Sequence, residues 1–229
     1  MRLKNFKLQF FGLMLLFTSC THEYEPAIEN DWRLDVSLEF ADAEFWPDGQ
    51  QIRLGVFDAS SNKEAVSSVI VNQPESGAVS VSLSHVPEGN YSLELYLTES
   101  GVYKVLLSEL GEIKLNENLQ VETDPIALLT YTRIQNQLFN KCQLCHGGSS
   151  GDIAAGLNLT AAQSYEQLIG VQAVMDPSRT RVIPGSPNYS YLVQVLEKDI
   201  DFDHDASNSL TPADKQLIVD WINEGALNN

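Results

Sequence analysis

Cysteine and histidine are scarce in this chain. Its 229 residues include only three cysteines and four histidines. A structural zinc site needs four Cys or His ligands at suitable spacing, and the sequence around the cysteines does not supply them. Cys142 and Cys145 stand close together, so Cys20 is left over as an odd cysteine that needs an explanation of its own.

Positive charge is also scarce. The chain has 14 Lys and Arg residues against 31 Asp and Glu residues, which gives a formal net charge of −17. Three of the basic residues, Arg2, Lys4 and Lys7, lie at the N-terminus, so the remainder has 11 basic residues and a formal charge of −20. This excess of negative charge argues against nucleic acid as a partner and against electrostatic docking on anionic lipid.

The N-terminal apolar run, residues 8–17, is too short to cross a membrane as a helix. It follows the basic N-terminus and precedes Thr18 and Ser19, which is the pattern of a signal peptide over residues 1–19. The ending LLFTSC resembles a bacterial lipoprotein signal, in which Cys20 is lipidated and becomes the new N-terminus. An ordinary cleaved signal with a free thiol is the alternative. Residues 20–30 then suit a polar tether between the lipid and the folded part. We therefore expect a lipid-anchored protein of the cell envelope, on the periplasmic or surface face of the outer membrane.

Residues 31–124 carry the period-two pattern of β-strands. Apolar and polar residues alternate from Trp32 to Phe40, and the same spacing returns around residues 52–56, 79–83 and 91–97. Turn signals rich in Pro, Gly, Asn and Asp separate these runs. The pattern predicts an all-β sandwich domain of about seven strands. The segment VPEGNYSLELYL resembles the closing strands of immunoglobulin-like or transthyretin-like modules.

Helical spacing begins after Pro125. Ile134, Leu138 and Cys142 recur every four residues, which predicts a helix that runs into CQLCH. Near the C-terminus, TPAD supplies an N-cap at Thr211 followed by proline, and Gly225 ends the predicted helix. Residues 125–229 are therefore predicted to form a second domain that is all-α.

The stretch CQLCH, residues 142–146, is the attachment motif of a c-type haem. Each thiol adds to one vinyl group of the porphyrin, so Cys142 and Cys145 must project the same way about one helical turn apart. The adjacent His146 then binds iron as an axial ligand. A helix end that carries two core cysteines, a thioredoxin-like redox pair and a zinc site are the alternatives. The motif predicts one covalent haem c.

The second half of the chain also resembles a known family. CQLCHGG, GLNL, VIPGSPNYSYL and LTPADKQLIVDWINEGA are similar to segments of class I cytochrome c-like domains found in bacterial surface and planctomycete-type proteins. The resemblance covers about residues 127–227. It implies an all-α cytochrome c-like fold and electron transfer for this region, and Trp221 is then expected to pack the last helix against the helix that carries Cys142.

The second iron ligand departs from that family. A Met-Pro segment is expected before the terminal helix, but KDIDFDHDASNSL stands there instead and contains no methionine. His204 is the favoured ligand, Met175 is the alternative, and an open or water-filled site is the third possibility. Arg181 and Arg179 are expected to pair with haem propionates or to lie on the surface.

The predicted function is one-electron transfer by a membrane-anchored monohaem c-type cytochrome. The protein is expected to be an electron carrier rather than an enzyme that converts a substrate, and its redox partner is not named by the sequence. Two alternatives belong to other classes. One is a haem sensor or enzyme with an open sixth iron site. The other is a surface binding or adhesion module whose β-sandwich is the functional part.

Overall fold

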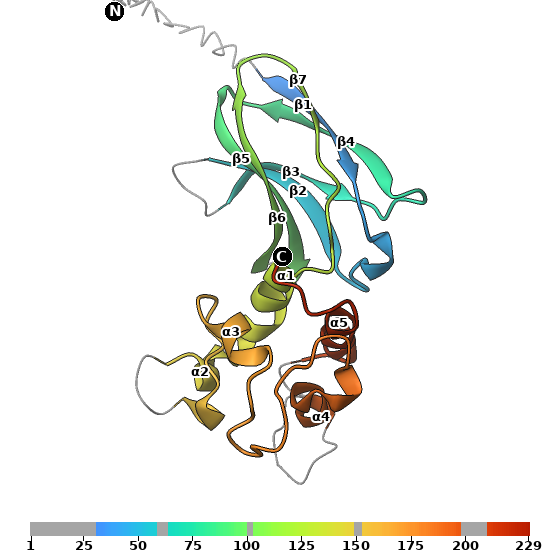
Figure 1. The fold of residues 1–229 in the computed structure, drawn as a ribbon. Helices are drawn as coiled ribbons and strands as arrows, with labels where there is room; N and C mark the ends of the chain where they lie inside the picture. Colours follow the sequence, from blue (N-terminus) through green and yellow to red (C-terminus); the bar gives the residue numbers. More distant parts are fainter. Residues whose placement is uncertain (1–30, 59–63, 100–102, 149–152, 198–209) are drawn as a thin grey trace, which may run out of the picture.

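The computed structural model describes residues 31–58, 64–99, 103–148, 153–197 and 210–229. The predicted signal peptide and tether, with Cys20, lie outside these residues, and so does His204. The described chain begins with a pair of β-sheets and continues into a helix-containing part at one end of the sheets (Figure 1).

Seven strands form two sheets in the first part of the described chain. One sheet has the order β4-β1-β7 and the other has the order β3-β2-β5-β6. The strands are β1 (Trp32–Glu39), β2 (Gln51–Asp58), β3 (Ala65–Val71), β4 (Ala78–Val86), β5 (Gly89–Glu99), β6 (Tyr103–Leu115) and β7 (Leu119–Glu122). Neighbours run antiparallel, except that β1 and β7 are parallel.

The alternation of apolar residues explains why these segments form strands. In β1, Leu34, Val36 and Leu38 are buried and the residues between them are more exposed. Successive side chains of a strand point to opposite faces, so one face of β1 lies in the core. Leu54 and Leu95 of the second sheet belong to the same hydrophobic cluster, and the two sheets therefore pack face to face.

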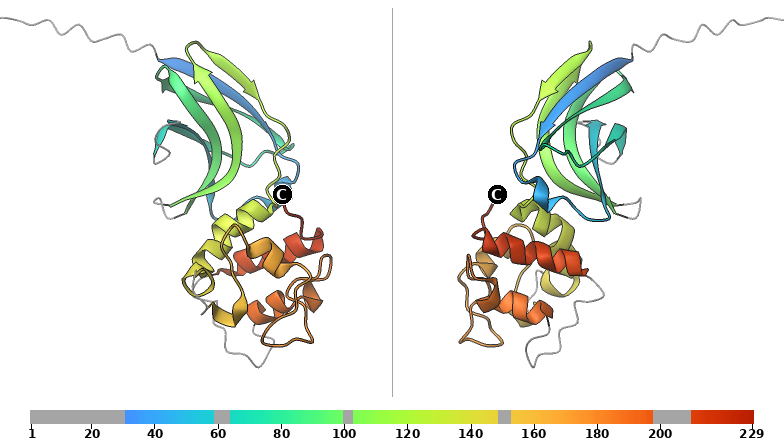
Figure 2. Two further views of the ribbon diagram at one scale, coloured as in Figure 1. Left: turned by 60° about the vertical axis from the view of Figure 1, so that its left-hand side comes forward. Right: turned by 90° about the vertical axis from the view of Figure 1, so that its right-hand side faces the viewer.

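The α-helices of the described chain follow residue 130 and are short. They are α1 (Tyr131–Ile134), α2 (Asn140–His146), α3 (Ser164–Leu168), α4 (Tyr191–Glu197) and α5 (Pro212–Asn223). A π-helical stretch, Gln135–Phe139, joins α1 to α2, so residues 131–146 form one helical segment. Figure 2 shows α5 beside this segment. No helix within the described residues is long and apolar enough to span a membrane.

The predicted fold class, an all-β domain followed by an all-α cytochrome c-like domain, is wrong. The described chain is mostly β, with seven strands in two sheets, and an all-α cytochrome c domain is not seen in it. The segment between α3 and α4 shows the physical reason. It folds back on itself through a parallel bridge between Ile169 and Val182 and an antiparallel bridge between Gln172 and Thr180. Helical spacing near CQLCH and at the C-terminus does not extend across this loop.

The C-terminal helix α5 starts and stops as its sequence predicts. The Thr211 hydroxyl accepts a hydrogen bond from the Asp214 N–H at 3.2 Å, and the Asp214 carboxylate accepts one from the Thr211 N–H at 2.9 Å. Gly225 follows the helix with φ +95°. This capping box is confirmed. Trp221 is buried and packs against Tyr131 in α1, with 5.2 Å between the ring centroids.

A buried arginine connects the sheets to the helices. Arg133 in α1 donates from Nη1 to the carbonyls of Phe45 at 2.8 Å and Leu128 at 2.9 Å. Its Nε donates to Gln137, whose amide in turn donates to Asp214 at 3.0 Å. Phe45 packs against the hydrophobic clusters of both parts. The two parts therefore share a polar network and an aromatic contact, while the predicted domain division at residues 124 and 125 stays a prediction.

Candidate functional site

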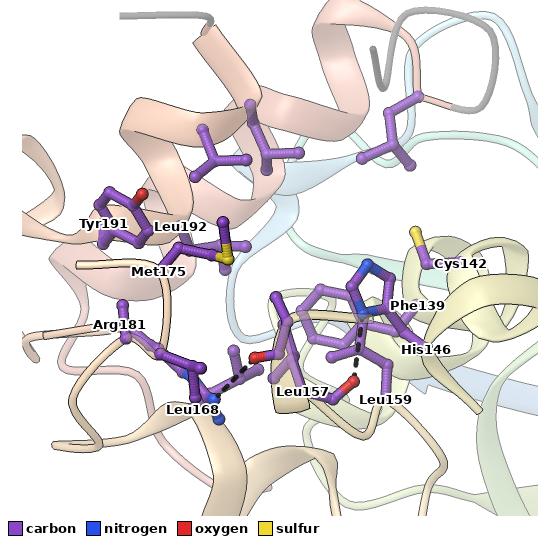
Figure 3. Close-up of a pocket in the computed structure, with 16 residues that line it drawn as sticks. Phe139, Cys142, His146, Leu157, Leu159, Leu168, Met175, Arg181, Tyr191 and Leu192 are labelled. Atoms are coloured by element: carbon purple, nitrogen blue, oxygen red, sulfur yellow. Dashed lines mark hydrogen bonds between the residues drawn. The ribbon is translucent and has the colours of Figure 1, made fainter. Parts of the chain in front are cut away.

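An apolar cavity of about 100 Å³ opens between α2, α4 and the loops that join the helices. Cys142 and His146 lie on one side of it and Met175 on another (Figure 3). The residues that line it are Phe139, Cys142, His146, Ala155, Leu157, Leu159, Leu168, Ala173, Val174, Met175, Arg181, Tyr191, Leu192, Val195, Leu196 and Leu210. The lining is dominated by aliphatic side chains, so the few polar groups among them point to what the cavity binds.

The helical register of α2 brings part of CQLCH to this cavity. Cys142 and His146 are four residues apart and both line it. Cys145 is exposed and is not among the lining residues. Leu144, between the two cysteines, is 96% exposed. The motif therefore lies at the edge of the cavity, with Cys142 and His146 toward the interior and Cys145 toward solvent.

Burial affects the first of the two thiols. Desolvation raises the pKa of the Cys142 thiol above its ordinary value, and the neighbouring Lys141 opposes this shift. The Cys142 Sγ lies 3.7 Å from the Leu138 carbonyl, one helical turn earlier. Cys142 is therefore held as a protonated thiol at neutral pH, in a fixed position on the cavity wall.

A backbone carbonyl orients the imidazole of His146. The His146 Nδ1 lies 3.1 Å from the Leu157 carbonyl oxygen. A carbonyl oxygen only accepts hydrogen bonds, so Nδ1 must carry the proton and donate it. In that tautomer Nε2 carries the lone pair of the ring, on the opposite side from Leu157 (Figure 3). A carbonyl on the far nitrogen is the usual support of a metal-binding histidine.

The carbonyl of Leu157 is presented by an unusual turn. Ala155 and Gly156 directly precede it, and both have positive φ, +51° and +58°. This left-handed conformation is uncommon for a residue with a Cβ, so Ala155 is strained by roughly 1 kcal/mol. The side chain of Arg181 holds the turn, because its Nη2 donates to the carbonyls of Gly156 at 3.1 Å and Ala155 at 3.4 Å.

Arg181 brings a buried positive charge to the cavity. Its side chain lines the cavity although the residue is only 6% exposed. Nη1 donates to the Gln167 carbonyl at 2.8 Å, so its described partners are carbonyls and an amide oxygen rather than carboxylates. Desolvation lowers the pKa of the guanidinium. A buried cation without a carboxylate partner in the described chain is suited to an anionic group of a ligand.

Met175 faces the same cavity from the loop between α3 and α4. It lines the cavity, and half of the side chain, 52%, is exposed. Met175 is the only methionine of the chain outside the predicted signal peptide, because the other two are Met1 and Met14. Figure 3 shows its sulfur directed toward the interior of the cavity, with His146 on the opposite side.

The structure thus brings four of the sequence-predicted residues together and separates others. Cys142, His146, Met175 and Arg181 share one cavity. Arg179 instead lies on the surface, where it forms an ion pair with Asp176 at 3.0 Å and bonds to Gln194. Of the two positions expected for these arginines, Arg179 takes the one on the surface, and Arg181 lines the cavity.

Two features of the site were missed by sequence reasoning. The acceptor for His146 is the backbone carbonyl of Leu157, and the donor that holds the preceding turn is Arg181. A backbone carbonyl is available at every residue, so it leaves no signal in the sequence.

The described chain lacks a metal site of the ordinary kind. No group of three or more His, Cys, Asp or Glu side chains within it is arranged to hold a metal ion. A porphyrin supplies four ligands to its own iron, so a haem needs only one or two side chains from the protein. Among the described residues that line the apolar cavity, His146 and Met175 are of types that bind haem iron.

Comparisons with known proteins do not identify the chain. No protein-family model matches it, and no curated protein matches it. The function must therefore be argued from the residues of the site.

Proposed function

We propose that the protein attaches one haem c covalently through Cys142 and Cys145 and carries single electrons in the cell envelope. The observation that carries the proposal is the position of CQLCH. The motif ends in a histidine that lines an apolar cavity and has its Nδ1 bonded to the Leu157 carbonyl at 3.1 Å. The proposal rests on this site and does not depend on a cytochrome c fold.

The residues of the cavity fit a haem in their chemistry. Cys142 and His146 line the cavity, with the His146 Nδ1 bonded to the Leu157 carbonyl, and Cys145 stands three residues after Cys142 at the exposed edge. Arg181 supplies a cation for the propionates, and the aliphatic lining suits the flat face of a porphyrin. The cavity holds about 100 Å³, whereas pockets for molecules of this size span roughly 300–1,000 Å³. A bound haem would therefore require the side chains at the mouth of the cavity to shift outward, and Val174 there is 60% exposed.

The chain's own residues would set the properties of the bound group. When bound, a c-type haem supplies an iron that alternates between Fe(III) and Fe(II), which is one-electron chemistry. His146 would hold the iron through Nε2, and the bond from Nδ1 to the Leu157 carbonyl would raise the basicity of that nitrogen. The aliphatic wall would reduce contact between a bound haem and water. The positive charge of Arg181 next to the cavity favours the reduced state, which carries one positive charge less.

The location of the protein completes the proposal. A lipid on Cys20 would hold the folded part at a membrane through the tether at residues 20–30. An electron carrier of this kind exchanges electrons with a partner protein, and the exposed Leu144 and Cys145 place the haem-attachment edge within reach of one. The haem, the anchor and the partner are all parts of the proposal.

The test is haem retention. The protein is produced in a host that matures c-type cytochromes and is then extracted with acidic acetone, which removes non-covalent haem. Wild type should keep its haem and give a sharp reduced α-band, whereas Cys142→Ser and Cys145→Ser should weaken or lose retention. Cys20→Ser is the matched control, because the same substitution outside the motif should leave retention unchanged. Haem that extracts freely from wild type would refute the proposal.

A further inference from the structure

Met175 lies in a closed loop between α3 and α4, and its side chain lines the cavity. The bridge between Gln172 and Thr180 closes the loop, and the Ala173 N–H donates to the Arg179 carbonyl at 2.9 Å. At the base, the Arg181 N–H donates to the Val171 carbonyl at 2.8 Å. The side chain of Arg181 also donates a hydrogen bond to the Gly156 carbonyl, in the turn that precedes Leu157. One residue therefore links the loop of Met175 to the turn that orients His146.

The residues after Met175 fix the tip of this loop. The Asp176 carboxylate accepts hydrogen bonds from the Ser178 N–H at 3.1 Å and from the Ser178 hydroxyl at 2.6 Å. Its other oxygen pairs with the Arg179 Nε at 3.0 Å. These bonds make a tight turn directly after Met175. The backbone of Met175 is thus held in place, and the flexible thioether side chain can adjust its reach.

The chemistry of the side chain suits this position. A thioether needs no hydrogen bond, and its sulfur is a soft ligand that haem iron accepts opposite a histidine. Axial ligands approach the iron from opposite faces of the porphyrin. Met175 and His146 lie on opposite sides of the one cavity, and the described chain offers no second histidine among the residues that line it.

We propose that Met175 is the second axial ligand of the iron, supplied by the loop between α3 and α4. This inference rests on the proposed attachment of haem at CQLCH. It replaces the sequence-based preference for His204. It also moves the ligand away from the Met-Pro position, just before the last helix, that the resemblance implies. The sulfur donates a lone pair to the iron, and no proton is released or taken up.

The first test compares spectra of wild type, Met175→Leu and His204→Ala, each matured with haem. Leucine has nearly the volume of methionine but carries no donor atom. Wild type should be low-spin in the ferric state, with the weak far-red band of methionine–iron ligation. Met175→Leu should lose that band, become high-spin and bind carbon monoxide when reduced, and His204→Ala should retain the band.

Two other results would overturn the assignment. A Met175→Leu protein that stays low-spin, or a His204→Ala protein that becomes high-spin, would make Met175 dispensable. The haem content of each variant separates this failure from failure of the proposed function. Equal covalent haem in wild type and Met175→Leu with unchanged spectra would refute only the ligand, whereas absence of covalent haem from wild type would refute the attachment itself.

A second measurement needs no substitution. The chain beyond the predicted signal peptide contains a single methionine, so labelling the methionine methyl groups with ¹³C gives one signal, that of Met175. In the ferrous protein a coordinated methyl group lies over the porphyrin ring, and its resonance should shift far upfield. A methyl resonance at the position of a solvent-exposed methionine would contradict the proposal.

Acidification gives an independent check. A coordinated histidine is released when its imidazole takes up a proton, and the free imidazole has a pKa of about 6.5. A thioether has no proton to gain over that range. The far-red band of wild type should therefore persist when His204 is protonated, until His146 itself is displaced or the fold is lost. If acidification abolished the low-spin spectrum of wild type but not that of His204→Ala, the result would contradict the proposal.

Discussion

Arg181→Leu tests whether this buried side chain holds the walls of the cavity together. Two of its hydrogen bonds have good geometry, from Nη1 to the Gln167 carbonyl at 2.8 Å and from Nη2 to the Gly156 carbonyl at 3.1 Å. A hydrogen bond from a charged group contributes about 1.5–3 kcal/mol. Burial of the guanidinium opposes part of this gain. The net loss of stability on substitution should be about 3 kcal/mol.

Urea unfolding of the mature protein measures this loss. With a slope of about 2 kcal/mol per molar, a loss of about 3 kcal/mol moves the midpoint down by roughly 1.5 M. Arg179→Leu is the matched control, because Arg179 lies two residues away on the surface, 42% exposed, in an ion pair with Asp176. Its midpoint should stay close to that of wild type. Equal shifts for the two variants, or an Arg181→Leu shift under about 0.5 M, would refute the reasoning.

Three further predictions concern single side chains. Burial raises the pKa of Tyr131 from 10.0 to about 12, so the native state keeps a proton that the unfolded state has lost. The stability from Tyr131 is therefore complete below pH 10 and is lost toward pH 12. In urea unfolding, the free energy of unfolding of wild type should be lower at about pH 11 than at about pH 9, and Tyr131→Phe should reduce this difference. An equal difference in the two proteins would contradict the prediction. In haem-free protein, an alkylating reagent should modify exposed Cys145 faster than Cys142, whose raised pKa keeps it protonated; equal rates would exclude this. Cys20→Ser should move the protein from the membrane fraction to the soluble exported fraction, since each buried acyl CH₂ contributes about 0.8 kcal/mol. An unchanged distribution would mean that Cys20 carries no anchor.

The sequence predicts the strands well because their cause is local. Leu34, Val36 and Leu38 alternate with polar residues, and a strand with one buried face must show this period. The cap of α5 is local too, since Thr211 and Asp214 satisfy each other's backbone within a single turn. Where a pattern and the structure it produces involve the same few residues, the sequence is sufficient.

The fold class is wrong because local signals were extended across a segment that lacks them. Helical spacing is present at Ile134 and Leu138 and again in α5, but the chain around Gln172 and Thr180 pairs with itself as a loop. Backbone hydrogen bonds between residues of a folded-back loop depend on where the chain returns. The position at which the chain folds back on itself does not produce a periodic pattern of apolar residues in the sequence.

The candidate site was likewise predictable from the sequence only in part. Cys142 and His146 stand four residues apart on α2, so the helical spacing that the sequence predicts is enough to place both on one wall of the cavity. The partner of His146 is the carbonyl of Leu157, and the proximity of Met175 depends on how its loop closes. The sequence offered Met175 only as an alternative, since its place in the chain does not match the family layout. Its place on the cavity wall, shared with His146, is what makes Met175 a candidate, while His204 lies outside the described residues.

Covalent attachment of haem at CQLCH is the central claim, and one peptide tests it. Trypsin should cleave after Lys141 and after Arg179, because no Lys or Arg lies between them, and release residues 142–179. This peptide contains both thiols of the motif. From protein matured with haem, its mass should be increased by one haem, and an alkylating reagent should modify neither Cys142 nor Cys145. A peptide of unmodified mass in which both cysteines react with the reagent would contradict the account.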